Sequence, residues 1–203
     1  MLTVRTGAGS PFGRKARIAI SVLGLDGKVA VEPAANQDPA DPIRKQNPLG
    51  KVPVLLLDDG GTLFDSPVIL EYLDMLAGGG KIIPAETKAR FEALRLQALA
   101  DGILDASILL VYEGRYRAKE KHEQKWLDLQ SGKVARGMAE LETKPPGLGT
   151  PPTVGEITLA CALGYGDFRF EGRWRKDYPK LVAWLDKFAA QVPAFDATKP
   201  PAG

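Results

Sequence analysis

A serine near the amino terminus stands where a helix is expected to begin. It is Ser10, within the small-residue stretch Gly7-Ala8-Gly9-Ser10-Pro11-Phe12-Gly13. Serine is a preferred residue just before a helix, and proline is favoured in the first helical turn. A thiolate brought to this point would be stabilised by the unpaired backbone N–H groups, the helix dipole and the serine hydroxyl. Taken alone, however, the stretch favours a plain helix cap over a thiolate site.

A second stretch places a proline at the entrance of an apolar strand. The chain there reads Asn47-Pro48-Leu49-Gly50-Lys51-Val52-Pro53-Val54-Leu55. Proline cannot donate to a sheet ladder and is tolerated at an edge or in a cis turn. A cis bond between Val52 and Pro53 would leave the backbone N–H and C=O of Val52 free to pair with an extended peptide ligand. A trans proline that ends a loop is the alternative, and it is the more common arrangement for an isolated X–Pro bond.

A third stretch, Asp65-Ser66-Pro67, combines a carboxylate with a serine at an expected helix start. The carboxylate of Asp65 could pair with an ammonium group. The hydroxyl of Ser66 and the first helix amides could bind a carboxylate, so the pair could hold an α-amino acid group from both sides. An ordinary Asp-Ser helix cap has the same sequence.

Alternating strands and helices are predicted to position these three stretches. Strands are expected at 1–4, 29–31, 52–57 and 62–64, and helices at 14–23 (opening at Pro11), at 42–46 and from Ser66 onward. Asp58-Asp59-Gly60-Gly61 lies between two apolar runs and predicts a hairpin. Ser66 is expected to be the N-cap of the next helix, with Pro67 at its first position. This order of elements predicts an α/β domain of about eighty residues.

From residue 87 onward the sequence has helical periodicity. An apolar seam of one long helix is expected to consist of Leu96, Leu99, Ile103, Ala106 and Leu110. Further helices are predicted at 124–142, after the capping box Thr153 to Glu156, and from Tyr178-Pro179, the last of the chain. The end, at 197–201, is expected to be extended. The second part is therefore predicted to be all-α.

The composition excludes several classes of protein. The 203 residues carry 27 basic and 25 acidic side chains, for a net charge of +2, without the basic stripe that nucleic acids or anionic membranes require. No apolar run has the length of a membrane span. The single cysteine excludes an intramolecular disulfide and any CxxC motif. We expect a soluble, cytoplasmic protein that holds no metal.

Two residues of reactive type are expected to play no chemical part. Cys161 lies in the apolar run 157–163 and is predicted to be a small buried thiol. His122, the only histidine, lies among charged residues and is expected to be solvated. Histidine-based catalysis and a histidine-rich metal site are therefore not expected.

Taken together, in this order and spacing, the three stretches resemble the glutathione S-transferase family. The similarity includes Phe64-Asp65-Ser66-Pro67-Val68-Ile69-Leu70-Glu71-Tyr72-Leu73 in the first part, and Ala100-Asp101-Gly102 with the capping box in the second. It covers nearly the whole chain and is closer to bacterial members that carry Phe-Asp-Ser-Pro and Ala-Leu-Ala-Asp-Gly. The resemblance implies a thioredoxin-like domain (1–77), a linker (78–86) and an all-helical domain (87–203) that lines an electrophile pocket, usually in a homodimer.

The resemblance also implies how glutathione, the co-substrate, would be bound. Ser10 would hold its sulfur, Val52 would pair with its cysteinyl backbone, and Pro53 would be cis. Asp65 and Ser66 would take the γ-glutamyl end. Many relatives have Glu or Gln at the position of Asp65. The aspartate side chain is one methylene shorter than that of glutamate, so its carboxylate would lie farther from the ligand.

Further contacts with glutathione are expected at Phe12, at Lys51 near the glycine carboxylate, and at Asp101. For Lys51 the alternative is a solvated loop lysine. Asp101 and Asp105 lie one helical turn apart, and because like charges at that spacing are unfavourable, some partner is expected. The alternative for Asp101 is a surface pair of carboxylates that binds arginines.

The implied activity is that of a glutathione transferase, in which the thiolate attacks a small hydrophobic electrophile. Serine at position 10 cannot form the mixed disulfide that cysteine would form there. A glutathione-dependent isomerase, lyase or peroxidase would use the same thiolate and remains an alternative. A non-catalytic ligand- or protein-binding module is the alternative from another class. Tyr112, Arg115 and Tyr116 are placed by the resemblance on the helix that borders the electrophile pocket, with a core or interface role as the alternative.

Overall fold

A four-stranded mixed sheet forms the centre of the amino-terminal part of the computed structural model, which describes residues 1–201. The strands are β1 (Leu2–Thr6), β2 (Val29–Pro33), β3 (Val54–Leu56) and β4 (Thr62–Leu63), in the spatial order β2-β1-β3-β4. β1 pairs with β2 in parallel and with β3 antiparallel, and β3 pairs antiparallel with β4. The expected hairpin at 58–61 is thereby confirmed.

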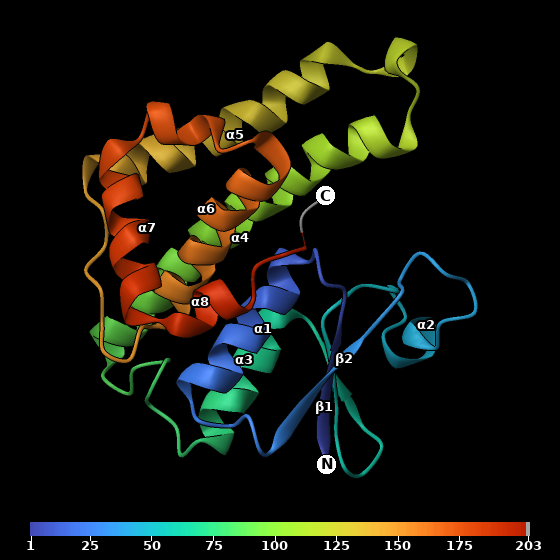
Figure 1. Ribbon diagram of the computed structural model, residues 1–203, viewed down its shortest axis with the longest axis vertical. Helices are drawn as coiled ribbons and strands as arrows, with labels where there is room; N and C mark the ends of the chain where they lie inside the picture. Colours follow the sequence, from blue (N-terminus) through green and yellow to red (C-terminus); the bar gives the residue numbers. More distant parts are fainter. Residues whose placement is uncertain (202–203) are drawn as a thin grey trace.

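Helices cover both faces of this sheet. α1 (Pro11–Val22) and α3 (Ser66–Leu76) lie side by side on one face (Figure 1). Inward-pointing residues of β1 are buried in the main core, as the alternating burial of this strand requires. The short helix α2 (Ile43–Gln46) packs Ile43 against Val54 in a small second cluster.

The rest of the chain is a bundle of helices. They are α4 (Thr87–Tyr116), α5 (Gln124–Thr143), α6 (Val154–Phe170), α7 (Pro179–Gln191) and α8 (Pro193–Ala197), with short 3-10 turns at Lys119–Lys121 and Arg173–Lys176. α6 packs against both α4 and α1 and so joins the bundle to the amino-terminal part (Figure 1). The contact with α4 is close, because a Cβ atom at Gly155 would lie 2.6 Å from the Ala93 carbonyl oxygen. The fold class predicted from the sequence is confirmed.

The capping box before α6 is also confirmed. The Thr153 hydroxyl accepts a hydrogen bond from the Glu156 N–H (3.4 Å), and the Glu156 carboxylate accepts one from the Thr153 N–H (2.6 Å). Both ends of this reciprocal pair satisfy N–H groups that the helix itself leaves unpaired.

Three local predictions were wrong or incomplete. Asp65, not Ser66, is the N-cap of α3, because its carboxylate accepts from the Ser66 N–H while the Ser66 hydroxyl has another partner. The helix that opens after Tyr178 is not the last, since α8 follows it and buries Phe195 against Phe188. Residue 197 therefore ends a helix instead of opening an extended tail.

The apolar seam of α4 was only partly predicted. Ile103 and Ala106 are buried as expected, whereas Leu96, Leu99 and Leu110 are half-buried. α4 packs against α5 on one side and α6 on the other, so its buried face is broader than one seam and includes polar positions.

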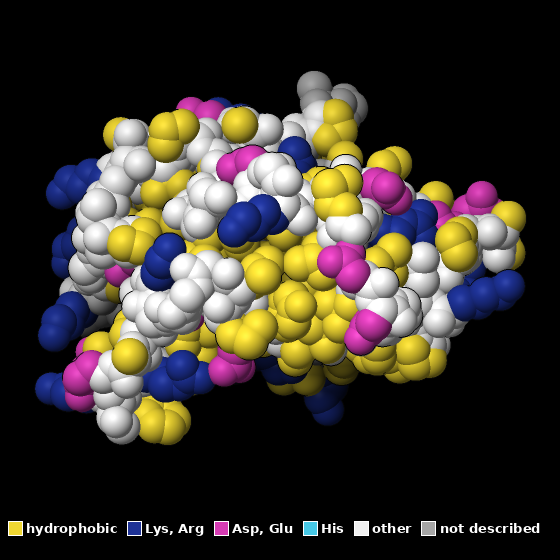
Figure 2. All heavy atoms as spheres, turned by 90° about the horizontal axis from the view of Figure 1, so that it is seen from below, with side chains coloured by type: hydrophobic (Ala, Val, Ile, Leu, Met, Phe, Trp, Pro, Cys, Tyr) yellow, Lys and Arg dark blue, Asp and Glu magenta, His cyan; other side chains and the backbone are white. Residues whose placement is uncertain are grey.

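The face at the end where β1 begins carries much apolar surface. Figure 2 shows apolar side chains gathered over the middle of this face, with charged side chains mainly toward its edges. Among the described residues, no helix is both long and apolar enough to cross a membrane.

Candidate functional site

Ser10 is held at the amino-terminal end of α1 by the turn that leaves β1. Its Oγ accepts a hydrogen bond from the Gly13 N–H at 3.1 Å, so Ser10 is the N-cap that the sequence predicted. A Cβ atom at Gly13 would lie 1.6 Å from the Thr6 Oγ1, and only glycine lets the first helical turn lie this close to β1. Because the Ser10 oxygen already accepts this bond, its hydroxyl proton is free to be donated outward.

The Val52–Pro53 peptide bond is cis. Asn47 fixes the preceding loop, since its side chain donates to the Lys51 carbonyl oxygen (3.1 Å) and accepts from the Leu49 N–H (3.0 Å). Val52 lies just before β3 and takes part in none of the loop and turn hydrogen bonds between residues 1 and 201. Its backbone is therefore placed to pair with a ligand.

Asp65 and Ser66 occupy different environments although they are neighbours. The Phe64–Asp65 peptide bond is cis, and the exposed carboxylate of Asp65 caps α3. Ser66 is fully buried, and its Oγ accepts a hydrogen bond from the Lys15 Nζ at 3.0 Å. With its oxygen accepting that bond, the Ser66 hydroxyl keeps its own proton to donate.

Sheet topology brings the three stretches to one end of the molecule. Arg5, near the end of β1, pairs with Val54, the first residue of β3. The loop after β1, which carries Ser10, therefore lies at the same end of the sheet as the turn before β3. β4 runs antiparallel to β3 and ends at Leu63, so Asp65 lies at that end of the sheet as well. Ser10, Val52 and Asp65 therefore end up at one end of the sheet.

A buried lysine links the amino-terminal part to the helical bundle. Lys15 of α1 has no exposed surface, and its Nζ lies 2.6 and 2.9 Å from the two carboxylate oxygens of Asp101 on α4 as well as 3.0 Å from Ser66. The same ammonium lies 5.7 Å from the ring centre of Phe12. Lys15 is thus the cationic partner that Asp101 requires.

No role was predicted for Lys15 from the sequence. A signal was present, because Lys15 stands three residues before Ile18 and four after Pro11, on the buried face of α1. A lysine on an apolar helix face needs a buried counter-charge, and a carboxylate elsewhere in the chain had to supply it.

Carboxylates gather around this ion pair. Burial raises the pKa of Asp101. The Lys15 ammonium opposes this rise, and the negative charges of Asp105 and Asp65 add to it. Burial likewise raises the pKa of Asp105, against the positive charge of Lys51. Three carboxylates and only two lysines thus influence one another, so this part of the site favours an additional cation such as an α-ammonium group.

A small hollow lies on the other side of Ser10, against α6. It is lined by Ala8, Gly9, Ser10, Pro11, Arg14, Cys161, Gly164, Tyr165 and Pro200. Burial raises the pKa of Cys161 to about 12, so its thiol stays protonated at neutral pH and is not a nucleophile. The prediction of a buried, inert thiol is confirmed.

Aromatic and basic residues of α4 and α6 pack against one another, and those of α6 lie beside Gly9 in the loop of Ser10. Tyr112 and Tyr116 of α4 are exposed and meet edge to face at 5.2 Å, and the Tyr116 hydroxyl accepts from Gln37. On α6, the Arg169 guanidinium lies 3.9 Å from the ring centre of Phe168. Neither Phe168 nor Arg169 was singled out from the sequence.

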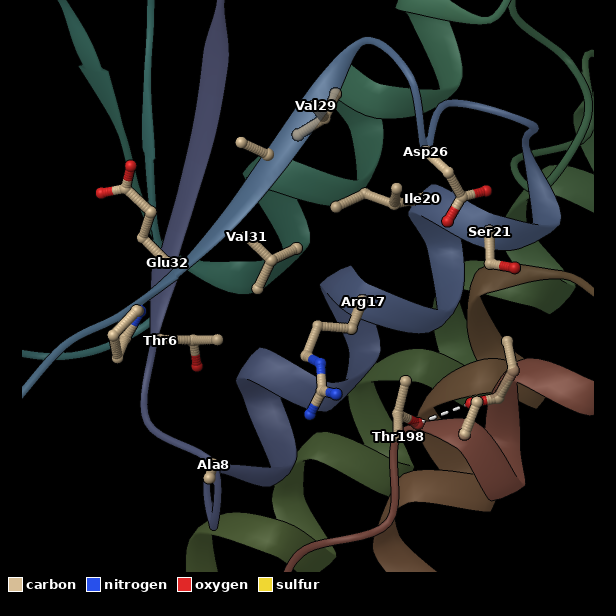
Figure 3. A pocket seen from close by; sticks show the side chains of 14 residues that line it. Thr6, Ala8, Arg17, Ile20, Ser21, Asp26, Val29, Val31, Glu32 and Thr198 are labelled. Carbon is tan, nitrogen blue, oxygen red and sulfur yellow. Dashed lines mark hydrogen bonds between the residues drawn. The ribbon is translucent and has the colours of Figure 1, made fainter.

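A larger hollow adjoins the small one and shares Ala8 with it. It lies between β2, α1 and α8, with Arg17, Asp26 and Glu32 among its lining (Figure 3). None of Ser10, Val52 and Asp65 lines it.

In residues 1–201, no group of three or more His, Cys, Asp or Glu side chains could hold a metal ion. His122 is half-buried, with its Nε2 3.2 Å from the Arg117 carbonyl oxygen.

Comparisons with known proteins give a consistent result over both parts of the chain. Residues 7–81 match the description "Glutathione S-transferase, N-terminal domain", and residues 124–187 match "Glutathione S-transferase, C-terminal domain". A curated relative from Escherichia coli (strain K12), "Uncharacterized GST-like protein YibF", is 34% identical over 197 aligned residues, and the match covers 95% of this chain and 95% of that protein.

Solved structures agree with this result. A glutathione transferase family member from Pseudomonas fluorescens Pf-5, with bound glutathione, is 42% identical and has a TM-score of 0.91 over 99% of this chain and 100% of that chain. A structure of the family member from that strain with bound S-(propanoic acid)-glutathione has the same identity and coverage and a TM-score of 0.88.

Proposed function

The chain belongs to the glutathione S-transferase family, and on that premise we propose that it is a glutathione transferase in which Ser10 stabilises the thiolate of glutathione. The observation that carries this proposal is the hydroxyl of Ser10 at the start of α1. Its oxygen accepts from the Gly13 N–H and its proton remains to be donated. A hydrogen bond to an anion is shorter and stronger than one between neutral groups, so this donor lowers the pKa of a bound thiol.

The remaining residues are proposed to hold the rest of glutathione. The free backbone of Val52, next to the cis Pro53, pairs with the cysteinyl residue in the manner of strand addition. Asp65 receives the γ-glutamyl ammonium, and the Ser66 hydroxyl, whose proton is still available, donates to the carboxylate of the same group. Bound glutathione in the 42% identical family member from Pseudomonas fluorescens supports the choice of ligand.

Three further residues are proposed to assist this binding. Phe12 follows Ser10 in the first turn of α1, and Lys51 precedes Val52 and faces the glycine carboxylate. Asp101 contributes negative charge near the γ-glutamyl ammonium, although its carboxylate is paired directly with Lys15. Its effect on glutathione is therefore one of charge at a distance and not of direct contact.

The proposed reaction joins the sulfur to a small electrophile in the cleft between the two parts of the chain. Holding both reactants there supplies proximity, and Ser10 supplies the anionic nucleophile. The relative with bound S-(propanoic acid)-glutathione supports space for a substituent on the sulfur. Serine at residue 10 and a protonated, buried Cys161 leave no protein thiolate for disulfide exchange, which favours transfer over thiol reductase chemistry.

We also propose that the protein works as a homodimer in the cytoplasm, where glutathione is kept reduced. Val68 and Met75 lie seven residues apart on one face of α3 and are exposed, as is Phe91 of α4. The pair of Arg90 and Glu71 (2.7 Å) joins the two helices there. Exposed apolar residues of this kind are typical of an interface. Sedimentation equilibrium is expected to give twice the chain mass of 21.9 kDa, and a monomer at micromolar concentration would contradict the proposal.

The proposed function is tested by binding and turnover together. Titration calorimetry is expected to show that each chain binds one glutathione with millimolar or tighter affinity. Difference absorbance of the thiolate is expected to show that the pKa of the bound thiol is below that of free glutathione. Conjugation of 1-chloro-2,4-dinitrobenzene is expected to exceed the uncatalysed rate. Glutathione binding with a normal thiol pKa and no turnover would favour the non-catalytic alternative, and absence of binding would remove the proposal altogether.

A further inference from the structure

Arg169 of α6 lies immediately beside the loop that presents Ser10. A Cβ atom at Gly9 would lie 3.2 Å from a guanidinium nitrogen of Arg169 and 3.3 Å from the ring of Phe168. The guanidinium also stacks on that ring, with 3.9 Å between its carbon and the ring centre. Stacking fixes the direction of the side chain, so the positive charge is held next to the residue before Ser10.

A second arginine, Arg115, lies on α4, the helix that packs against α6. The guanidinium carbon of Arg115 lies 5.6 Å from the ring centre of Tyr112. Both arginines lie close enough to the Tyr165 hydroxyl to affect its titration: burial raises the pKa of Tyr165, and the charges of Arg169 and Arg115 oppose that rise. Tyr165 in turn lines the small hollow with Ser10. Arg169 and Tyr165 are therefore the residues of α6 that lie near Ser10, and Arg115 adds its positive charge from α4.

Neither guanidinium has a carboxylate partner in the part of the chain that the structure describes. Within residues 1–201, neither Arg115 nor Arg169 has a carboxylate oxygen within 4.0 Å. Carboxylates do pair at that distance with five other arginines, namely Arg5, Arg90, Arg117, Arg173 and Arg175. Arg169, beside the loop of Ser10, and Arg115, on the neighbouring α4, thus have no carboxylate partner among residues 1–201.

The charges of the site are divided between its two halves. The carboxylates Asp65, Asp101 and Asp105 influence one another on the side where α3 and α4 meet α1, which is the proposed glutathione side. Arg115 and Arg169 lie on the side of Tyr165 and Gly9. A substrate that enters over Ser10 therefore meets the positive charge of Arg169 and the ring of Phe168, with Arg115 and the ring of Tyr112 on the neighbouring α4.

We infer that the electrophile carries a carboxylate, which Arg169 binds with help from Arg115 while its apolar body lies against the aromatic rings. The inference rests on the proposed function and goes beyond it by naming the class of substrate. Arginine suits this role because its planar, permanently charged group binds carboxylates through two parallel hydrogen bonds.

A halogenated aromatic acid is a suitable probe of this class. In 4-chloro-3-nitrobenzoate the thiolate sulfur forms a bond to the ring carbon that bears chlorine, and chloride leaves with the bonding electrons. The carboxylate takes no part in the reaction. The amide 4-chloro-3-nitrobenzamide has the same size and the same leaving group without the charge, so the pair isolates the contribution of the carboxylate.

The experiment compares kcat/KM for the acid and the amide, each divided by its uncatalysed rate with glutathione. The protein is expected to prefer the acid. Arg169→Gln is expected to lower that preference about tenfold, as loss of a hydrogen bond to a charged group implies, and Arg115→Gln by a smaller factor. Arg173→Gln removes the same charge from an exposed site just beyond the C-terminal end of α6, where Arg173 pairs with Glu171, and is expected to leave the preference as it was.

Added salt supplies an independent measurement, because the preference for the acid is expected to fall as ionic strength rises. A preference that stays within twofold in Arg169→Gln and in the double variant would overturn the inference while leaving the proposed transferase intact. Lack of turnover with both compounds would count against the transferase, and calorimetry with the acid and amide conjugates of glutathione would then decide the inference by binding. Equal affinities for the two conjugates would overturn it.

Discussion

Replacing Ser10 by alanine is expected to raise the pKa of the bound glutathione thiol and to lower kcat/KM for aryl halides at pH 6.5 about ten- to hundredfold. The factor corresponds to the roughly 1.5–3 kcal/mol that a hydrogen bond to a charged group contributes. Because the lost donor stabilises only the anion, most of the loss should be recovered at a pH above the new thiol pKa. The measurements are a pH profile of kcat/KM and a titration of thiolate absorbance in the complex.

The same substitution also removes a helix cap, so a matched control is needed. Ser10 caps α1 as Thr153 caps α6, and alanine at either position removes one side-chain acceptor, which costs about 1 kcal/mol of stability. Thr153→Ala should therefore lose similar stability without any change in the pH profile. An unchanged thiol pKa in Ser10→Ala would show that Ser10 is only a cap and would remove it from the proposed mechanism.

The features of this site that the sequence predicts are those made by residues close together in the chain. The caps at Ser10 and Thr153 and the hairpin at 58–61 are each formed within a few neighbouring residues, so local rules predict them. Local rules do not predict that Asp65, and not Ser66, caps α3. The Ser66 hydroxyl instead accepts a hydrogen bond from Lys15, which lies fifty-one positions away in the chain.

Contacts between the two parts of the chain were not predictable in the same way. Lys15 and Asp101 are separated by 86 positions, and nothing local to either residue names the other as its partner. Within the helical bundle, Arg115 and Arg169 come from α4 and α6, which are far apart in the chain and lie together because the two helices pack against each other. Such pairs need the tertiary fold before their chemistry can be described.

The pair of Lys15 and Asp101 leads to the second large effect. Lys15→Met is expected to destabilise the protein by about 3–5 kcal/mol at pH 8, because it leaves a carboxylate buried without its counter-charge. The side chain of Asp101 is only 17% exposed, so water compensates for little of this loss. Urea denaturation followed by circular dichroism gives the free energy of unfolding for comparison with the unaltered protein.

The pH dependence distinguishes loss of the ion pair from loss of packing. Burial raises the pKa of Asp101 in the folded protein even with Lys15 present, and without Lys15 the rise is expected to be larger. A carboxyl whose folded pKa exceeds its unfolded pKa binds more protons when folded, so stability falls as pH rises between the two values. The destabilisation in Lys15→Met should therefore be smaller at pH 5 than at pH 8.

A second substitution keeps the prediction testable if Lys15→Met folds poorly. In Lys15→Met/Asp101→Leu neither charge remains, and replacing a buried ion pair by apolar side chains of similar volume is often neutral or stabilising. The double variant is expected to recover most of the lost stability and to show none of the added pH dependence. A loss in Lys15→Met that is equal at both pH values, or that the double variant retains in full, would mean that the lysine stem contributes packing and that its charge does not stabilise the junction between α1 and α4.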